Sequence, residues 1–164
     1  MNSMELRCDL EDEQATLAFG AALACALPTS RPCVIWLRGD LGAGKTTLAR
    51  GAIQHFDPGA RVKSPTYALI ETYALHDFTL HHLDLYRVRD PSELEALGLR
   101  EFADDLLLIE WPERGGGATP VADIELLLRH TDSGQRHLEA VAPAVYGEQI
   151  LSELQQVLQR TGYE

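Results

Sequence analysis

The sequence predicts an α/β fold with a mixed, mostly parallel central sheet flanked by helices. Three observations support this prediction. Residues 33–37 and 106–109 are wholly apolar runs without alternation, which is typical of central strands covered on both faces. A glycine-rich stretch, residues 39–46, directly follows the first run. A segment with helical spacing, residues 46–55, comes next, so the predicted order is strand, loop and helix.

One strand and one helix are expected before the glycine-rich stretch. Residues 5–10 have the pattern of a short strand. The acidic residues 11–13 suit the positive N-terminus of a helix, which we expect to begin near residue 12. Apolar side chains at helical spacing continue from there until Pro28 ends the helix.

Short strands and helices alternate in the rest of the chain. The expected elements are antiparallel strands at 67–75 and 78–86, short helices at 90–97 and 100–105, the buried strand at 106–109, a hairpin of 124–130 with 136–141, and a helix at 144–160. Residues 64–66 and the glycines at 115–117 predict loops. The sequence contains neither an internal repeat nor a linker.

Composition indicates one acidic domain spanning residues 1–164. A chain of 164 residues, 45% of them hydrophobic, suffices for one buried core and is short for two. The formal charge of −11 repels polyanions, so we expect any RNA to be held by a partner. Three cysteines without CxxC spacing favour reduced thiols and a cytoplasmic location. The start lacks a signal pattern and no apolar run approaches a membrane span.

The stretch Gly39-Asp40-Leu41-Gly42-Ala43-Gly44-Lys45-Thr46 has the spacing of a phosphate-binding P-loop. Its glycines let the backbone approach phosphates closely, and the amides from Gly42 through Ala43 to Thr47 can point at phosphate oxygens. Lys45 is expected on the β- and γ-phosphates and Thr46 on Mg²⁺. The motif predicts a P-loop NTPase-like three-layer sandwich that binds ATP with Mg²⁺. GTP is disfavoured, because no Asn-Lys-x-Asp segment is present.

Two carboxylates at strand ends are candidates for the metal site and for catalysis. Glu110 ends the apolar run 106–109, where a P-loop ATPase needs an acidic residue to hold Mg²⁺ directly or through water. Asp84 ends the other predicted strand and is a candidate to order the attacking water. The alternative for each is a solvated carboxylate, since acidic residues are common at exposed strand ends.

Further side chains allow two interpretations each. Thr66 lies after the predicted P-loop helix, where GTPase-like folds carry a loop that senses the γ-phosphate and magnesium, although residues 64–66 also suit a proline-stiffened connection. Trp111 can pack near the nucleotide or in the core. Arg87 can serve a phosphate or form a surface ion pair. Histidines and cysteines lack the spacing of a zinc site, so zinc is not predicted.

The segments GDLGAGKTT, KSPTY, HLDLYR and LLLIEWPER, in that order, closely resemble the TsaE (YjeE) family of small bacterial ATPases. They span residues 39–114, and the acidic start EDEQATLAFG is similar to the family too. The resemblance implies a role in making threonylcarbamoyladenosine beside the tRNA anticodon, together with TsaB and the transferase TsaD. It implies that ATP hydrolysis resets the complex between rounds and that tRNA is contacted only through the complex.

The resemblance also assigns roles to single residues. It implies ATP binding by residues 42–47, magnesium ligation by Thr46 and Glu110, and catalysis by Asp84 together with Lys45 and Glu110. It places Thr66 in a switch-like segment, Trp111 beside the nucleotide and Glu13 near the adenine. No arginine finger is obvious near the P-loop, so we expect slow hydrolysis that TsaB and TsaD stimulate.

Two other functions fit a P-loop. A small-molecule kinase uses the same loop, but the segment after Glu110 continues into Glu113-Arg114 and three glycines, with few basic residues to clamp a second phosphate. A nucleotide-dependent binding module would not need hydrolysis. Separate substitution of Lys45 and Glu110 distinguishes such a module from an ATPase.

Overall fold

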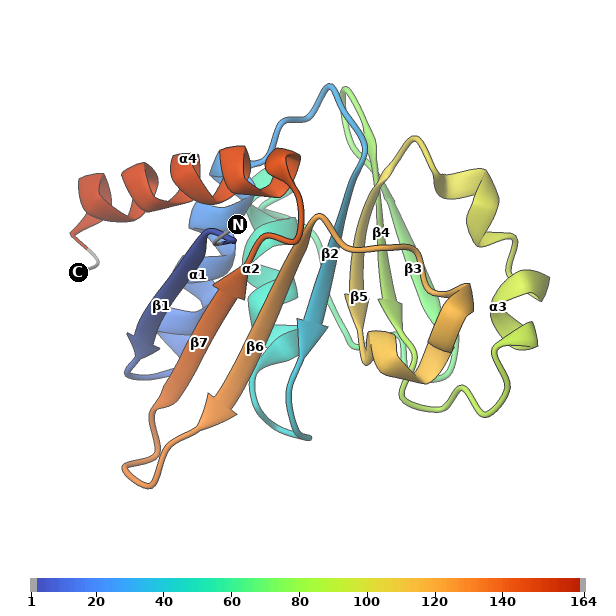
Figure 1. The fold of residues 1–164 in the computed structure, drawn as a ribbon, viewed down its shortest axis with the longest axis horizontal. Helices are drawn as coiled ribbons and strands as arrows, with labels where there is room; N and C mark the ends of the chain where they lie inside the picture. Colours follow the sequence, from blue (N-terminus) through green and yellow to red (C-terminus); the bar gives the residue numbers. More distant parts are fainter. Residues whose placement is uncertain (1–2, 163–164) are drawn as a thin grey trace.

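The computed structural model describes residues 3–162 and places seven strands in one sheet (Figure 1). The elements in chain order are β1 (Glu5–Leu10), α1 (Glu13–Ala26), β2 (Cys33–Arg38), α2 (Lys45–Phe56), β3 (Ile70–Ala74), β4 (Thr79–Asp84), α3 (Ser92–Ala96), η1 (Leu99–Phe102), β5 (Leu106–Glu110), η2 (Pro112–Ala118), β6 (Ile124–His130), β7 (Arg136–Val141) and α4 (Val145–Thr161). The strand order is β1-β7-β6-β2-β5-β4-β3. The central strands β6, β2, β5 and β4 are parallel, which confirms the predicted mixed α/β sheet.

Helices cover the two faces of this sheet unequally. Figure 1 shows α1 and α2 on one face, where the buried side chains of Ile35, Leu37, Leu48 and Ile53 belong to the larger core. The short segments α3, η1 and η2 lie on the other side, where a smaller core includes Leu107 and Ile109 of β5. Each fully buried aliphatic side chain of this kind stabilises the fold by about 1.5–3 kcal/mol.

Helices α1 and α2 touch each other through glycines. A Cβ atom at Gly51 would lie 2.1 Å from the carbonyl oxygen of Leu17, and one at Gly20 would lie 2.2 Å from that of Leu48. The two backbones are therefore in direct contact. Because α2 begins at the end of the glycine loop, this contact fixes where the loop lies.

Strands β3 and β4 are shorter than the sequence predicts. Residues 67–69 turn instead of joining β3, because the amide of Leu69 donates to the carbonyl of Pro65 at 2.8 Å and Leu69 has a φ of 64°. Strand β4 ends at Asp84, whose carboxylate accepts a hydrogen bond from the amide of Tyr86 and turns the chain.

Two predicted segments take a different local form. The expected helix at 100–105 is the 3₁₀ turn η1, and the glycines expected as a loop belong to the 3₁₀ segment η2, which is interrupted at Gly116. The other elements match the prediction within two residues. Within residues 3–162, no helix is long and apolar enough to cross a membrane.

The parallel pairing brings three strand ends to one edge of the sheet. Asp84 at the end of β4 pairs with Glu110 at the end of β5, and Glu110 pairs with Leu37 near the end of β2. The glycine loop follows β2 directly. Consequently the loop and both predicted carboxylates lie side by side.

Candidate functional site

The glycine loop borders a cavity of about 370 Å³. Most residues that the sequence predicts for the site line it: Gly42, Gly44, Lys45, Thr46, Thr47, Thr66, Asp84, Glu110 and Trp111. The lining also contains Leu41, Ser64, Tyr86, Arg87 and Arg136. The fold therefore gathers side chains from five separate stretches of sequence around one space.

Two predicted residues do not line this cavity. Ala43, within the loop, is completely buried. Glu13 lies in the first turn of α1, where its side chain is 64% exposed and its carboxylate is 3.6 Å from the guanidinium of Arg50. Strand β1 runs in the same direction as β2, so α1 begins at the edge of the sheet that carries the glycine loop. Glu13 is thus at the correct edge but outside the cavity lining.

Positive φ angles allow the glycine loop to curl tightly over the start of α2. Gly39 has a φ of 144°, and a Cβ atom there would lie 2.4 Å from the carbonyl oxygen of Leu128 in β6. Gly44 has a φ of 106° and is the N-cap of α2, with no side chain to cap the first amides. Unsatisfied amides at a helix N-terminus attract anions.

Lys45 lines the cavity and is buried, with only 4% of its surface exposed. Its ammonium donates hydrogen bonds to the carbonyls of Gly39 at 2.6 Å and Asp40 at 2.8 Å. It also lies 4.4 Å from the centre of the Trp111 ring. Burial lowers the pKa of Lys45, and the nearby carboxylates of Glu110 and Asp84 oppose this effect. The loop thus holds a cation next to the free amides.

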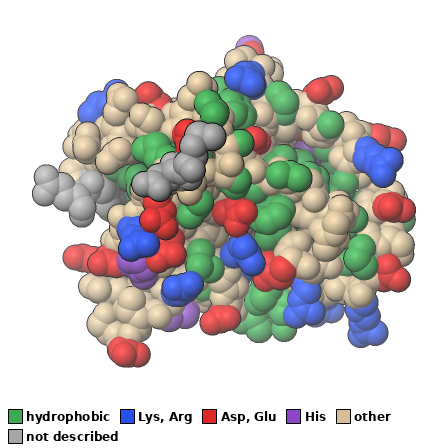
Figure 2. Space-filling view, viewed as in Figure 1, with side chains coloured by type: hydrophobic (Ala, Val, Ile, Leu, Met, Phe, Trp, Pro, Cys, Tyr) green, Lys and Arg blue, Asp and Glu red, His purple; other side chains and the backbone are tan. Residues whose placement is uncertain are grey.

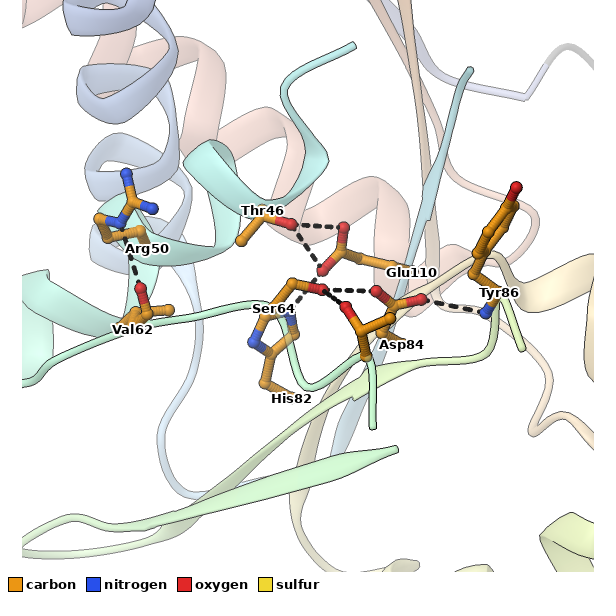
Figure 3. A network of polar contacts seen from close by, with 9 residues as sticks. Thr46, Arg50, Val62, Ser64, His82, Asp84, Tyr86 and Glu110 are labelled. Atoms are coloured by element: carbon orange, nitrogen blue, oxygen red, sulfur yellow. Dashed lines mark hydrogen bonds and ion pairs between the residues drawn. The ribbon is translucent and has the colours of Figure 1, made fainter. Parts of the chain in front are cut away.

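Thr46 and Glu110 are in direct contact (Figure 3). The hydroxyl of Thr46 donates to the Glu110 carboxylate, at 2.9 Å from Oε1 and 3.1 Å from Oε2. The Nε2 atom of His82, in β4, lies 2.7 Å from Oε2. Glu110 is only 2% exposed, and its carboxylate is held from two elements.

Asp84 has a separate set of partners (Figure 3). Its carboxylate accepts from the hydroxyl of Ser64 at 2.5 Å and from the amide of Tyr86 at 3.0 Å. The Ser64 hydroxyl is also 3.1 Å from that of Thr66. The predicted switch-like segment is therefore linked to the predicted catalytic carboxylate through Ser64.

The β6–β7 hairpin contributes residues that sequence reasoning missed. His130 lies 2.7 Å from the carbonyl oxygen of Gly42, and the side chain of Arg136 packs directly on Gly44. This hairpin carries no motif, so nothing in its sequence indicates that it borders the loop. Ser64 and His82 did lie inside recognised segments, and their polar side chains next to predicted site residues were the available signal.

These groups suit a polyphosphate with a divalent cation. Free amides, Lys45 and Arg136 present positive charge to an anion. The oxygens of Thr46 and Glu110 are hard ligands of the kind that Mg²⁺ prefers, and the two side chains already lie within hydrogen-bond distance of each other. Among the described residues, no cluster of three or more His, Cys, Asp and Glu offers an all-protein metal cage.

Known proteins share this sequence and fold. Residues 10–138 match the family described as Threonylcarbamoyl adenosine biosynthesis protein TsaE. The Haemophilus influenzae protein named tRNA threonylcarbamoyladenosine biosynthesis protein TsaE is 42% identical over 148 residues, which cover 87% of this chain and 93% of that protein. A Rickettsia bellii protein of the same name is 36% identical over 138 residues, covering 83% of this chain and 94% of that protein.

The fold has a counterpart among crystal structures as well. The Bacillus protein YdiB superimposes with a TM-score of 0.80 and covers 95% of this chain and 97% of its own, at 24% identity. At that identity the likeness shows a shared fold. The family match and the relatives extend over most of the sequence, and the matched residues 10–138 include every residue that lines the cavity. The chain therefore belongs to the TsaE family of tRNA threonylcarbamoyladenosine biosynthesis proteins.

Proposed function

We propose that this protein binds and hydrolyses ATP as a subunit of the cytoplasmic complex that makes threonylcarbamoyladenosine in tRNA, working with TsaB and TsaD. The observation that carries the proposal is the direct contact of Thr46 with Glu110 beside the buried Lys45, all within one cavity. Family membership supports the pathway, and the names of the relatives place them in it.

Each step of the proposed reaction has a residue to perform it. The loop amides and Lys45 bind the β- and γ-phosphates. Thr46 and Glu110 hold Mg²⁺, which when bound neutralises charge on those phosphates. Asp84, held by Ser64 and Tyr86, orders the attacking water. Ser64 and Thr66 line the same cavity and Ser64 contacts Asp84, so the proposal assigns this segment to sensing the γ-phosphate and relaying its release to Asp84.

The acidic net charge of the chain supports a role in which partner proteins, and not this chain, contact the RNA. The net charge is −11, and on the face shown in Figure 2 the Lys and Arg side chains are interspersed with Asp and Glu. Tight binding of nucleic acid depends on many cationic contacts with phosphates. In the proposal, TsaB and TsaD therefore hold the tRNA, and this subunit contacts those proteins.

Phosphate release by the purified protein tests this function. The proposal predicts slow release of ADP and inorganic phosphate in equal amounts, faster release when TsaB and TsaD are added, and loss of release with Asp84→Asn. Absence of hydrolysis even with both partners would contradict it. Transfer of the phosphoryl group to an added metabolite, in place of water, would instead identify a small-molecule kinase.

A further inference from the structure

A completely buried histidine lies beneath the Thr46–Glu110 pair. His82 has 0% of its surface exposed, and its Nε2 is 2.7 Å from Glu110 Oε2. A carboxylate can only accept hydrogen bonds, so Nε2 carries the proton and donates it. The other ring nitrogen, Nδ1, is buried and has no hydrogen-bond partner within residues 3–162. Glu110 is therefore the polar partner of His82 in the described chain.

The strand register explains how this contact arises. His82 pairs with Leu108, and Asp84 pairs with Glu110 one step further along the same two strands. Alternate side chains of a strand share a face. His82 and Glu110 are therefore diagonal neighbours on the face that carries α2, so the imidazole reaches Oε2 of the same carboxylate that Thr46 contacts through both oxygens.

Burying the imidazole of His82 costs free energy that an apolar side chain at the same position would not cost. A polar ring with an unpartnered nitrogen is less favourable at a fully buried strand position than an apolar side chain. Leu80, two residues earlier on the same face of β4, is completely buried in the larger core and shows that leucine is accommodated on this face. The bond to Glu110 is thus the feature that sets His82 apart from a core residue.

We propose that His82 is a positioning residue that fixes the Glu110 carboxylate for Mg²⁺. The inference rests on the proposed function, because it takes Glu110 as a magnesium-site residue. The bond from His82 to Oε2 restrains the carboxylate against Thr46, so Glu110 loses less rotational freedom when the cation binds. Hydrogen bonds to metal-ligating side chains typically change metal affinity by about 10–100-fold.

The neighbouring histidine provides a matched control. His81 is 3% exposed and its Nε2 is 2.7 Å from a carboxylate, that of Asp105. It points to the opposite face of β4, stacks on Phe102 and does not line the cavity. Substitution of His81 therefore removes a contact between a buried histidine and a carboxylate, together with the 2.9 Å contact of its Nδ1 with Thr72, without touching Glu110.

Metal binding to the ATP complex of the full chain tests the role of His82. Mn²⁺ is titrated in place of Mg²⁺ and followed by electron paramagnetic resonance, while ATP binding without metal is measured in EDTA. His82→Leu should weaken Mn²⁺ binding by about 10–100-fold and leave metal-free ATP binding unchanged. His81→Leu should bind Mn²⁺ like the wild type. Wild-type affinity for Mn²⁺ in His82→Leu would overturn the inference.

Two polar variants keep the test decisive if His82→Leu does not fold. The amide of Gln extends to the position of Nε2 and can still donate, whereas the shorter Asn cannot reach Glu110. His82→Gln should therefore retain Mn²⁺ affinity within a few-fold and His82→Asn should lose it, and equal affinities would overturn the inference. If wild-type protein binds neither ATP nor Mn²⁺, it is the proposed function that fails.

Discussion

Asp84 and Glu110 end adjacent parallel strands as a register pair, yet they share no hydrogen-bond partner in the described chain. Glu110 is held by Thr46 and His82, whereas Asp84 is held by Ser64 and the amide of Tyr86. Two carboxylates with different partners at the end of one sheet are suited to different tasks. Their substitution should therefore produce separable defects.

Glu110→Gln should lose the metal-dependent part of ATP binding. Glutamine keeps the shape of the side chain but lacks the charge that attracts Mg²⁺. Losing a charged contact of about 1.5–3 kcal/mol corresponds to about 10–100-fold weaker Mg²⁺ binding. Titration of Mg²⁺ at fixed ATP measures this change. A metal dependence identical to that of the wild type would show that Glu110 has no role in holding the cation.

Asp84→Asn should reduce turnover while leaving ATP affinity within a few-fold. The amide cannot take a proton from water, and general base catalysis typically contributes about 10²–10⁴-fold. Single-turnover hydrolysis at saturating ATP separates the chemical step from binding. Equal losses in affinity and turnover would instead place Asp84 among the groups that bind nucleotide.

The loop, its flanking strand and helix, and both carboxylates could be predicted because each depends on local sequence. The apolar runs of β2 and β5 and the spacing of the glycines specify these features over short distances. The contacts of His82 and Arg136 could not be predicted, because they depend on which strands become neighbours and in which register. The early turn at Leu69 was missed for a similar reason, since residues 67–75 alone have a strand-like pattern.

Gly51→Ala should destabilise the protein. The added methyl group would lie 2.1 Å from the backbone carbonyl of Leu17, which cannot rotate away. Overpacking of this kind costs about 1–3 kcal/mol and exceeds the gain in helix propensity of up to about 1 kcal/mol. Urea unfolding measures the difference. Gly117→Ala is the matched control, because its Cβ would meet nothing within 4 Å and its stability should stay close to that of the wild type.

Thiol labelling should distinguish the three cysteines. Cys25 is exposed, whereas burial raises the pKa of Cys8 to about 11 and raises that of Cys33 further. Because the thiolate reacts, native protein at about pH 8 should be alkylated at Cys25 first. Labelling of Cys8 should increase as the pH rises toward its raised pKa. Mass spectrometry of native and urea-unfolded samples checks this order, and fast native labelling of Cys33 would be inconsistent with its burial.

The raised thiol pKa values also affect stability at alkaline pH. The unfolded thiols ionise near their ordinary pKa of 9.0, whereas the folded thiol of Cys8 stays protonated until about 11. The unfolded state therefore binds fewer protons above about pH 9, and the free energy of unfolding should decrease as the pH rises through this range. Below about pH 8 these two groups should cause no pH dependence, which unfolding curves at several pH values can verify.

Calorimetric titration of ATP with Mg²⁺ into wild-type and Lys45→Ala protein tests most directly whether the glycine loop binds a triphosphate. Wild-type protein should give saturable heat, and Lys45→Ala should bind about 10–100-fold more weakly because a charged contact of about 1.5–3 kcal/mol is lost. Arg61→Ala, which removes an exposed cation instead, should bind ATP with the same affinity as the wild type. Equal affinity in wild-type and Lys45→Ala protein, or no saturable heat from the wild type at millimolar ATP, would contradict the account.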